Sequence, residues 1–295
     1  MPCMLRLGLL LNGTRGMTIA QTALSSSNAG ISWVIAPRGS KLVESQSSFS
    51  ERGVEIYQVA TASELLKLSE RCEDVDIIIS AGFPYRIPRL FFSKSKILSC
   101  NFHGGPLPSY RGGSPLNWQI INGESIIKLT VHVIEEEFDT GDILLTSSFE
   151  MSREWDISHV QNLANEHFSR MFRQILSDPL SILLRKKSQS KANAQYWHQR
   201  SEQDGEIVWS VLDSLQVCQL VRAITLPYPG AHARLSSGEL VKIWKVKVDD
   251  TPICGIPGRV VFQQGTPHVV CAKNTSVELF SFESTVSLKN GMRFL

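Results

Sequence analysis

Residues 5–25 have the sequence LRLGLLLNGTRGMTIAQTALS, and this stretch is the first indication of the fold class. Residues 5–11 form an apolar run typical of a buried strand. The run breaks at Asn12-Gly13-Thr14-Arg15-Gly16, and a helical pattern follows over residues 17–25. The stretch therefore predicts a strand, a turn and a helix. The turn has neither the G-x-G-x-x-G nor the P-loop pattern, so it does not indicate a dinucleotide or ATP site.

Similar units follow along the first two thirds of the chain. Strands are predicted over residues 31–36, 75–80, 96–102, 130–134 and 143–149, and helices over 63–72, 115–122 and 156–184, the last broken at Asp178-Pro179. Strands that alternate with helices are typical of a parallel α/β sheet, here a Rossmann-like first domain.

The composition changes near residue 185, where Lys, Arg, Ser and Gln dominate as in an exposed linker. We expect a catalytic domain over 1–190, a linker over 191–206 and a β-rich domain over 207–295. A helix over 214–222 and short β runs over 241–248, 258–262, 268–272 and 277–282 favour a small barrel or sandwich, with an OB-like barrel as our assignment. Its apolar strands could supply a homodimer face.

Composition excludes several classes of protein. The 295 residues carry 30 Lys and Arg against 28 Asp and Glu, a net charge of +2 that is too balanced for general nucleic-acid binding. The six cysteines show no C-x-x-C pair and no metal-ligand spacing, so we expect reduced thiols in a cytoplasmic protein without structural zinc. No apolar run approaches the length of a membrane span, and we expect no membrane association.

The densest group of unusual residues begins where the strand over 96–102 ends, the edge at which open parallel sheets place their ligands. Asn101 and His103 are two residues apart, so on an extended chain their side chains point the same way. A loop constrained by Gly and Pro follows, and a polar turn over 138–142 brings back Asp139. An amide, an imidazole and a carboxylate suit acyl transfer to an amine: Asn101 donates to the oxyanion, His103 handles a proton, and Asp139 orients His103 or accepts from the amine.

Other residues near this group have two interpretations each. Tyr110 and Arg111 either lock the loop or contact a ligand. His132, on a predicted strand, is interpreted as a core residue or one that lies behind the site, and a role in the site itself is the alternative. Glu135-Glu136-Glu137 is interpreted as a solvated turn, and we assign no metal.

Asn-Phe-His at 101–103, the loop Pro-Leu-Pro-Ser-Tyr-Arg-Gly-Gly-Ser-Pro at 106–115 and Asp-Thr-Gly-Asp at 139–142 together resemble the folate-dependent formyltransferases. The segments around 196–209 and 222–231 are similar to the inter-domain and C-terminal parts of the two-domain members of that family. The resemblance covers most of the chain. It implies formyl transfer from 10-formyltetrahydrofolate to a primary amine through a tetrahedral intermediate.

The resemblance also implies roles for residues of this chain. Asn101, His103 and Asp139 take the catalytic roles. The segment 82–87 looks like the loop that holds the pterin of the donor, and the residues expected at the donor site are Phe83, Pro84, Tyr85, Arg86, Ile87 and Asp142. The residues expected at the acceptor are Tyr110, Arg111, Gly112 and Gly113.

The acceptor is the open question. Members of the family that act on tRNA resemble one another in a basic insertion after the second strand, whereas residues 38–52 here hold three basic and two acidic residues. We therefore favour a small-molecule amine, that of a nucleotide-linked amino sugar, as the acceptor. Methionyl-tRNA formyltransferase is the alternative enzyme, and a formyltransferase-like module without turnover is the alternative outside catalysis.

Overall fold

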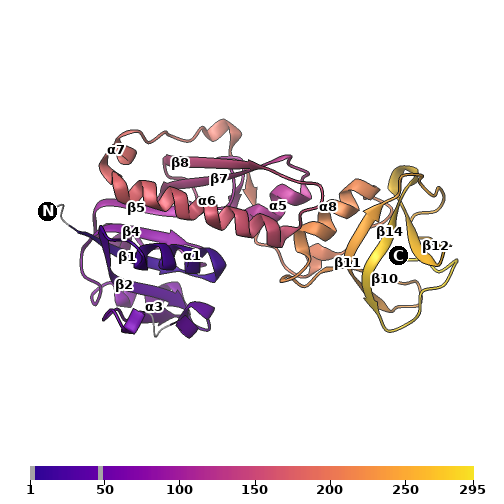
Figure 1. Ribbon diagram of the computed structural model, residues 1–295, viewed down its shortest axis with the longest axis horizontal. Helices are drawn as coiled ribbons and strands as arrows, with labels where there is room; N and C mark the ends of the chain where they lie inside the picture. Colours follow the sequence, from indigo (N-terminus) through magenta and orange to yellow (C-terminus); the bar gives the residue numbers. More distant parts are fainter. Residues whose placement is uncertain (1–3, 46–48) are drawn as a thin grey trace. The chain divides into compact units, whose positions relative to one another are not determined.

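The computed structural model describes residues 4–45 and 49–295, and it falls into two compact units (Figure 1). The first comprises the described residues up to 115 together with 128–149 and 162–197, and the second comprises 116–127, 150–161 and 198–295. One of the six cysteines, Cys3, lies outside the described residues, and the other five are free thiols. No helix in the described ranges is both long enough and apolar enough to cross a membrane.

The first unit is built on a seven-stranded sheet in the order β3-β2-β1-β4-β5-β7-β8. The strands are β1 (Leu5–Leu11), β2 (Ala29–Pro37), β3 (Ile56–Val59), β4 (Val75–Ala81), β5 (Ser95–His103), β7 (Ile126–Val133) and β8 (Ile143–Glu150). The five strands from β3 to β5 in this order run parallel. The side chains of β1 and β4 are buried almost throughout, which explains their continuous apolar sequences.

The expected parallel sheet is mixed, because β7 pairs antiparallel with β5. After β5 the chain does not cross back to the start of the strand. It passes through the Gly/Pro loop and α5 (Pro115–Ile121), and then enters the sheet beside the carboxyl end of β5. The reversal sets the register that pairs Asn101 with His132.

The other α-helices that the structure bounds before residue 185 are α1 (Gly13–Leu24), α3 (Ala62–Leu68), α4 (Arg89–Phe92), α6 (Ile157–Ser177) and α7 (Pro179–Leu184). The predicted turn at residues 12–16 is wrong in its extent, since α1 begins at Gly13. The extended Asn12 caps the helix, and its carbonyl oxygen accepts from the Gly16 amide at 3.1 Å. Arg15 therefore projects from the first turn of a helix instead of from a loop.

The second unit contains a five-stranded antiparallel sheet in the order β10-β11-β14-β13-β12. Its strands are β10 (Ala231–Arg234), β11 (Leu240–Val248), β12 (Val260–Gln263), β13 (Thr266–Cys271) and β14 (Thr275–Ser284), and α8 (Ser214–Ile224) precedes them. Asp213 and Gln216 form a capping box at the start of α8.

The last residues of the chain join the two edges of this sheet. The Phe294 amide donates to the Gly258 carbonyl at 2.9 Å beside β12, and the Leu295 amide donates to the Arg234 carbonyl at 2.9 Å at the end of β10. These bonds close the sheet into a barrel, which the sequence analysis had assigned in preference to a sandwich.

Candidate active site

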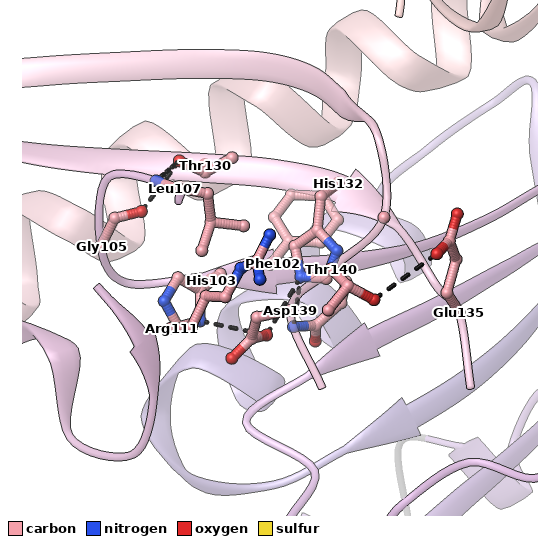
Figure 2. Close-up of polar contacts among 12 residues, drawn as sticks. Phe102, His103, Gly105, Leu107, Arg111, Thr130, His132, Glu135, Asp139 and Thr140 are labelled. Carbon is pink, nitrogen blue, oxygen red and sulfur yellow. Dashed lines mark hydrogen bonds and ion pairs between the residues drawn. The ribbon is translucent and has the colours of Figure 1, made fainter. Parts of the chain in front are cut away.

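The carboxyl end of β5 carries Asn101 and His103, and β7 lies beside it. The two side chains point the same way along the strand, and the antiparallel register places His132 next to Asn101 and Thr130 next to His103. His103 and His132 are buried, with 4% and 3% of their surfaces exposed. Figure 2 shows the two imidazoles with the Asp139 carboxylate beside them.

Asp139 reaches this point from a tight turn after β7. It adopts a left-handed conformation, with φ +57°. A Cβ at Gly141 would lie 2.0 Å from the Val133 carbonyl oxygen, so only glycine fits there. The Gln189 side-chain amide donates to the carbonyl oxygens of Asp139 and Gly141, at 2.9 and 2.7 Å. The carboxylate is therefore held in place by its own turn.

The Asp139 carboxylate connects the three predicted catalytic residues and His132. Its Oδ1 lies 3.4 Å from His103 Nδ1 and 3.2 Å from His132 Nε2. The Asn101 Nδ2 lies 3.2 Å from the same His132 Nε2, and the Gly112 amide donates to Asp139 Oδ2 at 2.9 Å. The structure thus brings Asn101, His103 and Asp139 into one cluster, with His132 between the amide and the carboxylate.

Backbone carbonyls determine where the imidazole protons lie. His103 Nε2 is 2.6 Å from the Tyr110 carbonyl oxygen, and His132 Nδ1 is 2.8 Å from the Val133 carbonyl oxygen. A carbonyl oxygen only accepts, so each of these nitrogens bears a proton. In a neutral His103 the unprotonated nitrogen is then Nδ1, which faces Asp139.

The two central groups have shifted pKa values. Burial lowers the pKa of the His103 imidazole, as do the positive charges at His132 and Arg15, against the attraction of Asp139 and the hydrogen bond to Tyr110. Burial alone would raise the pKa of Asp139. Attraction to His103 in its protonated form and the hydrogen bonds from His132 and the Gly112 amide outweigh it, so the pKa of this carboxyl lies well below its usual range. Asp139 is therefore an anion at neutral pH.

A pocket opens beside this cluster. It is lined by Ser80, Phe83, Tyr85, Arg86, Ile87, Asn101, His132, Ile134 and residues 135–139. Four of the six residues predicted for the donor are among them, and Phe83 and Tyr85 pack edge to face at 5.6 Å. Pro84 is exposed on the same loop and does not line the pocket. Asp142 also lies outside the lining, and its carboxylate pairs with Lys186 Nζ at 2.9 Å.

The residues predicted for the acceptor contribute mainly to the loop itself. The Tyr110 ring stacks on Trp197 at 5.3 Å. The Arg111 guanidinium donates to Gln189 Oε1 and to the Tyr196 hydroxyl, at 2.7 to 3.1 Å. Gly112 binds Asp139 through its amide, and the Gly113 amide donates to the Trp197 carbonyl oxygen at 2.9 Å. Of the two interpretations of Tyr110 and Arg111, these contacts favour the lock on the loop.

Two residues of this cluster were not among the site residues predicted from the sequence. His132 was interpreted as a core residue or one behind the site, and its position between Asn101 and Asp139 depends on the antiparallel register. Gln189 lies in the polar stretch interpreted as linker-like, yet its side chain holds both the Asp139 turn and Arg111. His132 could have been placed beside Asn101 only if the antiparallel pairing of its strand and the register of that pairing had been predicted. No local pattern indicates Gln189.

Known proteins resemble the chain in sequence and in fold. Two family models match it, Formyl transferase over residues 37–176 and Formyl transferase, C-terminal domain, over residues 200–284. The bifunctional polymyxin resistance protein ArnA of Wigglesworthia glossinidia brevipalpis is 31% identical over 215 residues, which are 71% of this chain and 31% of ArnA. The methionyl-tRNA formyltransferase of Caldanaerobacter subterraneus subsp. tengcongensis is 26% identical over 249 residues, which are 82% of this chain and 78% of that enzyme.

A solved structure shares the fold over nearly the whole chain. It is that of WlaRD, a sugar 3N-formyl transferase, determined in the presence of dTDP and 5-N-formyl-THF. The TM-score is 0.69 at 16% sequence identity, and the match covers 97% of this chain and 99% of WlaRD.

Proposed function

Because the chain belongs to the formyltransferase family, we propose that it transfers a formyl group from 10-formyltetrahydrofolate to the primary amine of a nucleotide-linked amino sugar. The observation that carries the proposal is the cluster of Asn101, His103 and Asp139 beside the pocket of the 83–87 loop. An amide donor, an imidazole and a buried carboxylate in one cluster are what transfer of an acyl group to an amine requires.

The side chains around this pocket, whose cavity is about 60 Å³, have the chemistry that the ring of a folate needs. Its walls combine apolar side chains, Phe83, Ile87 and Ile134, with the polar groups of Ser80 and Asn101. Ligand sites of this kind hold a flat heterocycle between apolar surfaces and orient it with a few polar atoms. When bound, the donor supplies an electrophilic formyl carbon. The chain's own residues stabilise the charge and move the proton in the transfer.

The geometry suggests a division of roles. Asn101 donates a hydrogen bond to the oxyanion that forms when the amine attacks the formyl carbon. The lowered pKa of His103 favours its neutral form, whose Nδ1 faces Asp139 and accepts the proton that the amine loses. Asp139 stabilises the imidazolium formed at that point, which returns the proton to the donor nitrogen as the bond between this nitrogen and the formyl carbon breaks and tetrahydrofolate leaves. The sequence left open whether His103 acts as an acid or a base, and burial favours the base.

Two observations support an amino sugar as the acceptor. WlaRD, which shares the fold over 97% of this chain, is a sugar 3N-formyl transferase whose structure was determined with dTDP. Residues 38–52 carry three basic and two acidic residues, and so small an excess of positive charge would bind RNA phosphates only weakly. The methionyl-tRNA formyltransferase of C. subterraneus, matched over 82% of this chain, supports initiator tRNA as the second candidate. The cytoplasmic location and the homodimer stay predictions.

The test measures formyl transfer by product mass. The purified chain is given 10-formyltetrahydrofolate and either dTDP- and UDP-linked amino sugars or charged initiator tRNA. A mass gain on one sugar supports the proposal, whereas a gain on the tRNA alone establishes the second candidate. His103→Ala is expected to abolish turnover and to leave folate binding intact. His159→Ala, at an exposed histidine on α6, is the matched control. No gain on any acceptor, with folate still bound, contradicts the proposal.

A further inference from the structure

Arg15 makes a direct contact with the strand that carries the candidate catalytic residues. It lies in the first turn of α1, and its Nη1 donates to the carbonyl oxygen of Phe102 at 2.9 Å. Phe102 stands between Asn101 and His103 on β5. The hydrogen bond therefore holds the peptide unit that joins Phe102 to His103. A bond from a charged donor to a partly buried carbonyl is stronger than one between neutral groups.

The same guanidinium takes part in the packing around Phe102. It lies over the ring of Phe168 on α6, with Cζ 4.9 Å from the ring centroid. Phe168 packs edge to face on Phe102, with 5.7 Å between the centroids. Both rings are fully buried. Arg15 thus contacts the backbone of Phe102 directly and its side chain through Phe168, so it limits the movement of this strand end in two ways.

Arg15 also places a positive charge near His103. This charge lowers the pKa of His103 in the same direction as burial and His132 do, while Asp139 and the Tyr110 carbonyl act in the opposite direction. These are the groups that face the imidazole. Loss of the Arg15 charge is therefore expected to raise the pKa of His103.

We propose that Arg15 is a positioning residue for the active site, which fixes the Phe102 carbonyl and so holds Asn101 and His103 in their working orientation. The role rests on the proposed formyl transfer, since it acts through Asn101 and His103. Without these contacts, nothing would distinguish Arg15 from any other partly buried arginine on a helix. The hydrogen bond to Phe102 and the contact with Phe168, which packs on Phe102, both bear on the residue that separates Asn101 from His103.

The first experiment does not depend on turnover. The histidine resonances of the whole chain are followed by NMR against pH, and His103 is assigned by its loss in His103→Ala. Arg15→Gln is expected to move the His103 midpoint to higher pH, whereas Arg15→Lys keeps the charge and leaves the midpoint near that of the wild type. Arg173→Gln, at an exposed arginine on α6, is the control and should have no effect. If both the chemical shifts and the titration midpoint of His103 stay unchanged in Arg15→Gln, neither the environment nor the charge state of His103 depends on Arg15, and the proposal is overturned.

The second experiment measures kinetics with the acceptor found above. Arg15→Gln is expected to lower kcat about tenfold, equivalent to about 1.4 kcal/mol in the barrier, with little change in KM for the donor. The pH–rate profile should move to higher pH, whether the neutral or the protonated imidazole is the active form. Arg15→Lys keeps the positive charge, so its pH–rate profile should match that of the wild type. It lacks the planar group that binds the carbonyl, so it should recover only part of kcat. Wild-type kcat in both variants overturns the proposal. Absence of turnover in the wild type contradicts the proposed function and leaves the NMR test valid.

Discussion

The Asp139 carboxylate is the single side chain that all other members of the cluster contact or depend on. It faces two imidazoles and accepts from the Gly112 amide. Asp139→Asn keeps the size of the side chain and an oxygen for that amide, but it removes the charge that stabilises a protonated His103. We expect kcat to fall by roughly 10²–10⁴. Asp74→Asn, at an exposed carboxylate paired with Lys94, is the control and should keep wild-type kcat. Normal turnover in Asp139→Asn would remove Asp139 from the mechanism.

The depressed pKa of Asp139 also predicts how stability depends on pH. A carboxyl whose pKa is lower in the folded state stabilises the fold above its unfolded pKa of about 4, and this contribution is lost as the pH falls toward the folded value. The difference in unfolding free energy between the wild type and Asp139→Asn should therefore shift against the wild type from about pH 5 to about pH 3. Denaturant titrations at each pH measure it. A constant difference over this range would mean that the carboxyl has an ordinary pKa in the folded chain.

Site residues could be predicted from the sequence where their positions depend only on the spacing of neighbouring residues along one strand. The two-residue spacing of Asn101 and His103 places them on one face of a strand, and the structure has them so. Asp139 required the further assumption that its turn folds back on the strand end. The contact between His132 and Asn101 depends on the register of a reversed strand, and Arg15 depends on where a helix starts. Neither follows from the side chains near it in the sequence.

Gly112 shows how one element, the loop after β5, is fitted to its neighbour. It has φ +96°, and a Cβ there would lie 2.2 Å from the Trp197 carbonyl oxygen. Gly112→Ala must therefore shift the loop and with it the amide that binds Asp139. We expect a loss of about 3 kcal/mol in unfolding free energy together with lower kcat. Gly39→Ala is the matched control. Its φ is +78° but no atom lies within 4 Å of the added Cβ, so the cost should be about 1–2 kcal/mol. Equal losses of unfolding free energy at the two positions would show that the loop accommodates the added Cβ of Gly112→Ala without strain.

The elements themselves were largely predictable from hydrophobic pattern, and the exceptions have physical causes. The strands β1 and β4 are largely apolar, and Asp178-Pro179 separates α6 from α7 as expected. The four-residue strands β3 and β10 are too short to show a period, and neither was predicted. The antiparallel direction of β7 was not predicted, because the alternation of strands and helices does not show at which end the chain re-enters a sheet.

At the scale of the whole molecule, the proposed chemistry lies in the first unit, while the second unit contains the barrel, which residues 294 and 295 close. Phe294 belongs to the closing segment. Its side chain is 1% exposed and stacks on Trp209, with 5.4 Å between the ring centroids. The residue thus combines the backbone bonds that join the two sheet edges with a contact in the barrel core.

Replacing Phe294 tests whether this closure holds the barrel together. Phe294→Ala is expected to cost about 3–5 kcal/mol, because it leaves a cavity beside Trp209 and loosens the segment that joins β10 to β12. Phe280→Ala removes an equal side chain from β14, but that ring is 64% exposed, and its cost should stay below about 1 kcal/mol. Hydrogen exchange should accelerate in the peptides of both β10 and β12 for Phe294→Ala alone. Acceleration at only one of the two edges, or equal costs for the two phenylalanines, would show that the barrel is stable without its C-terminal closure.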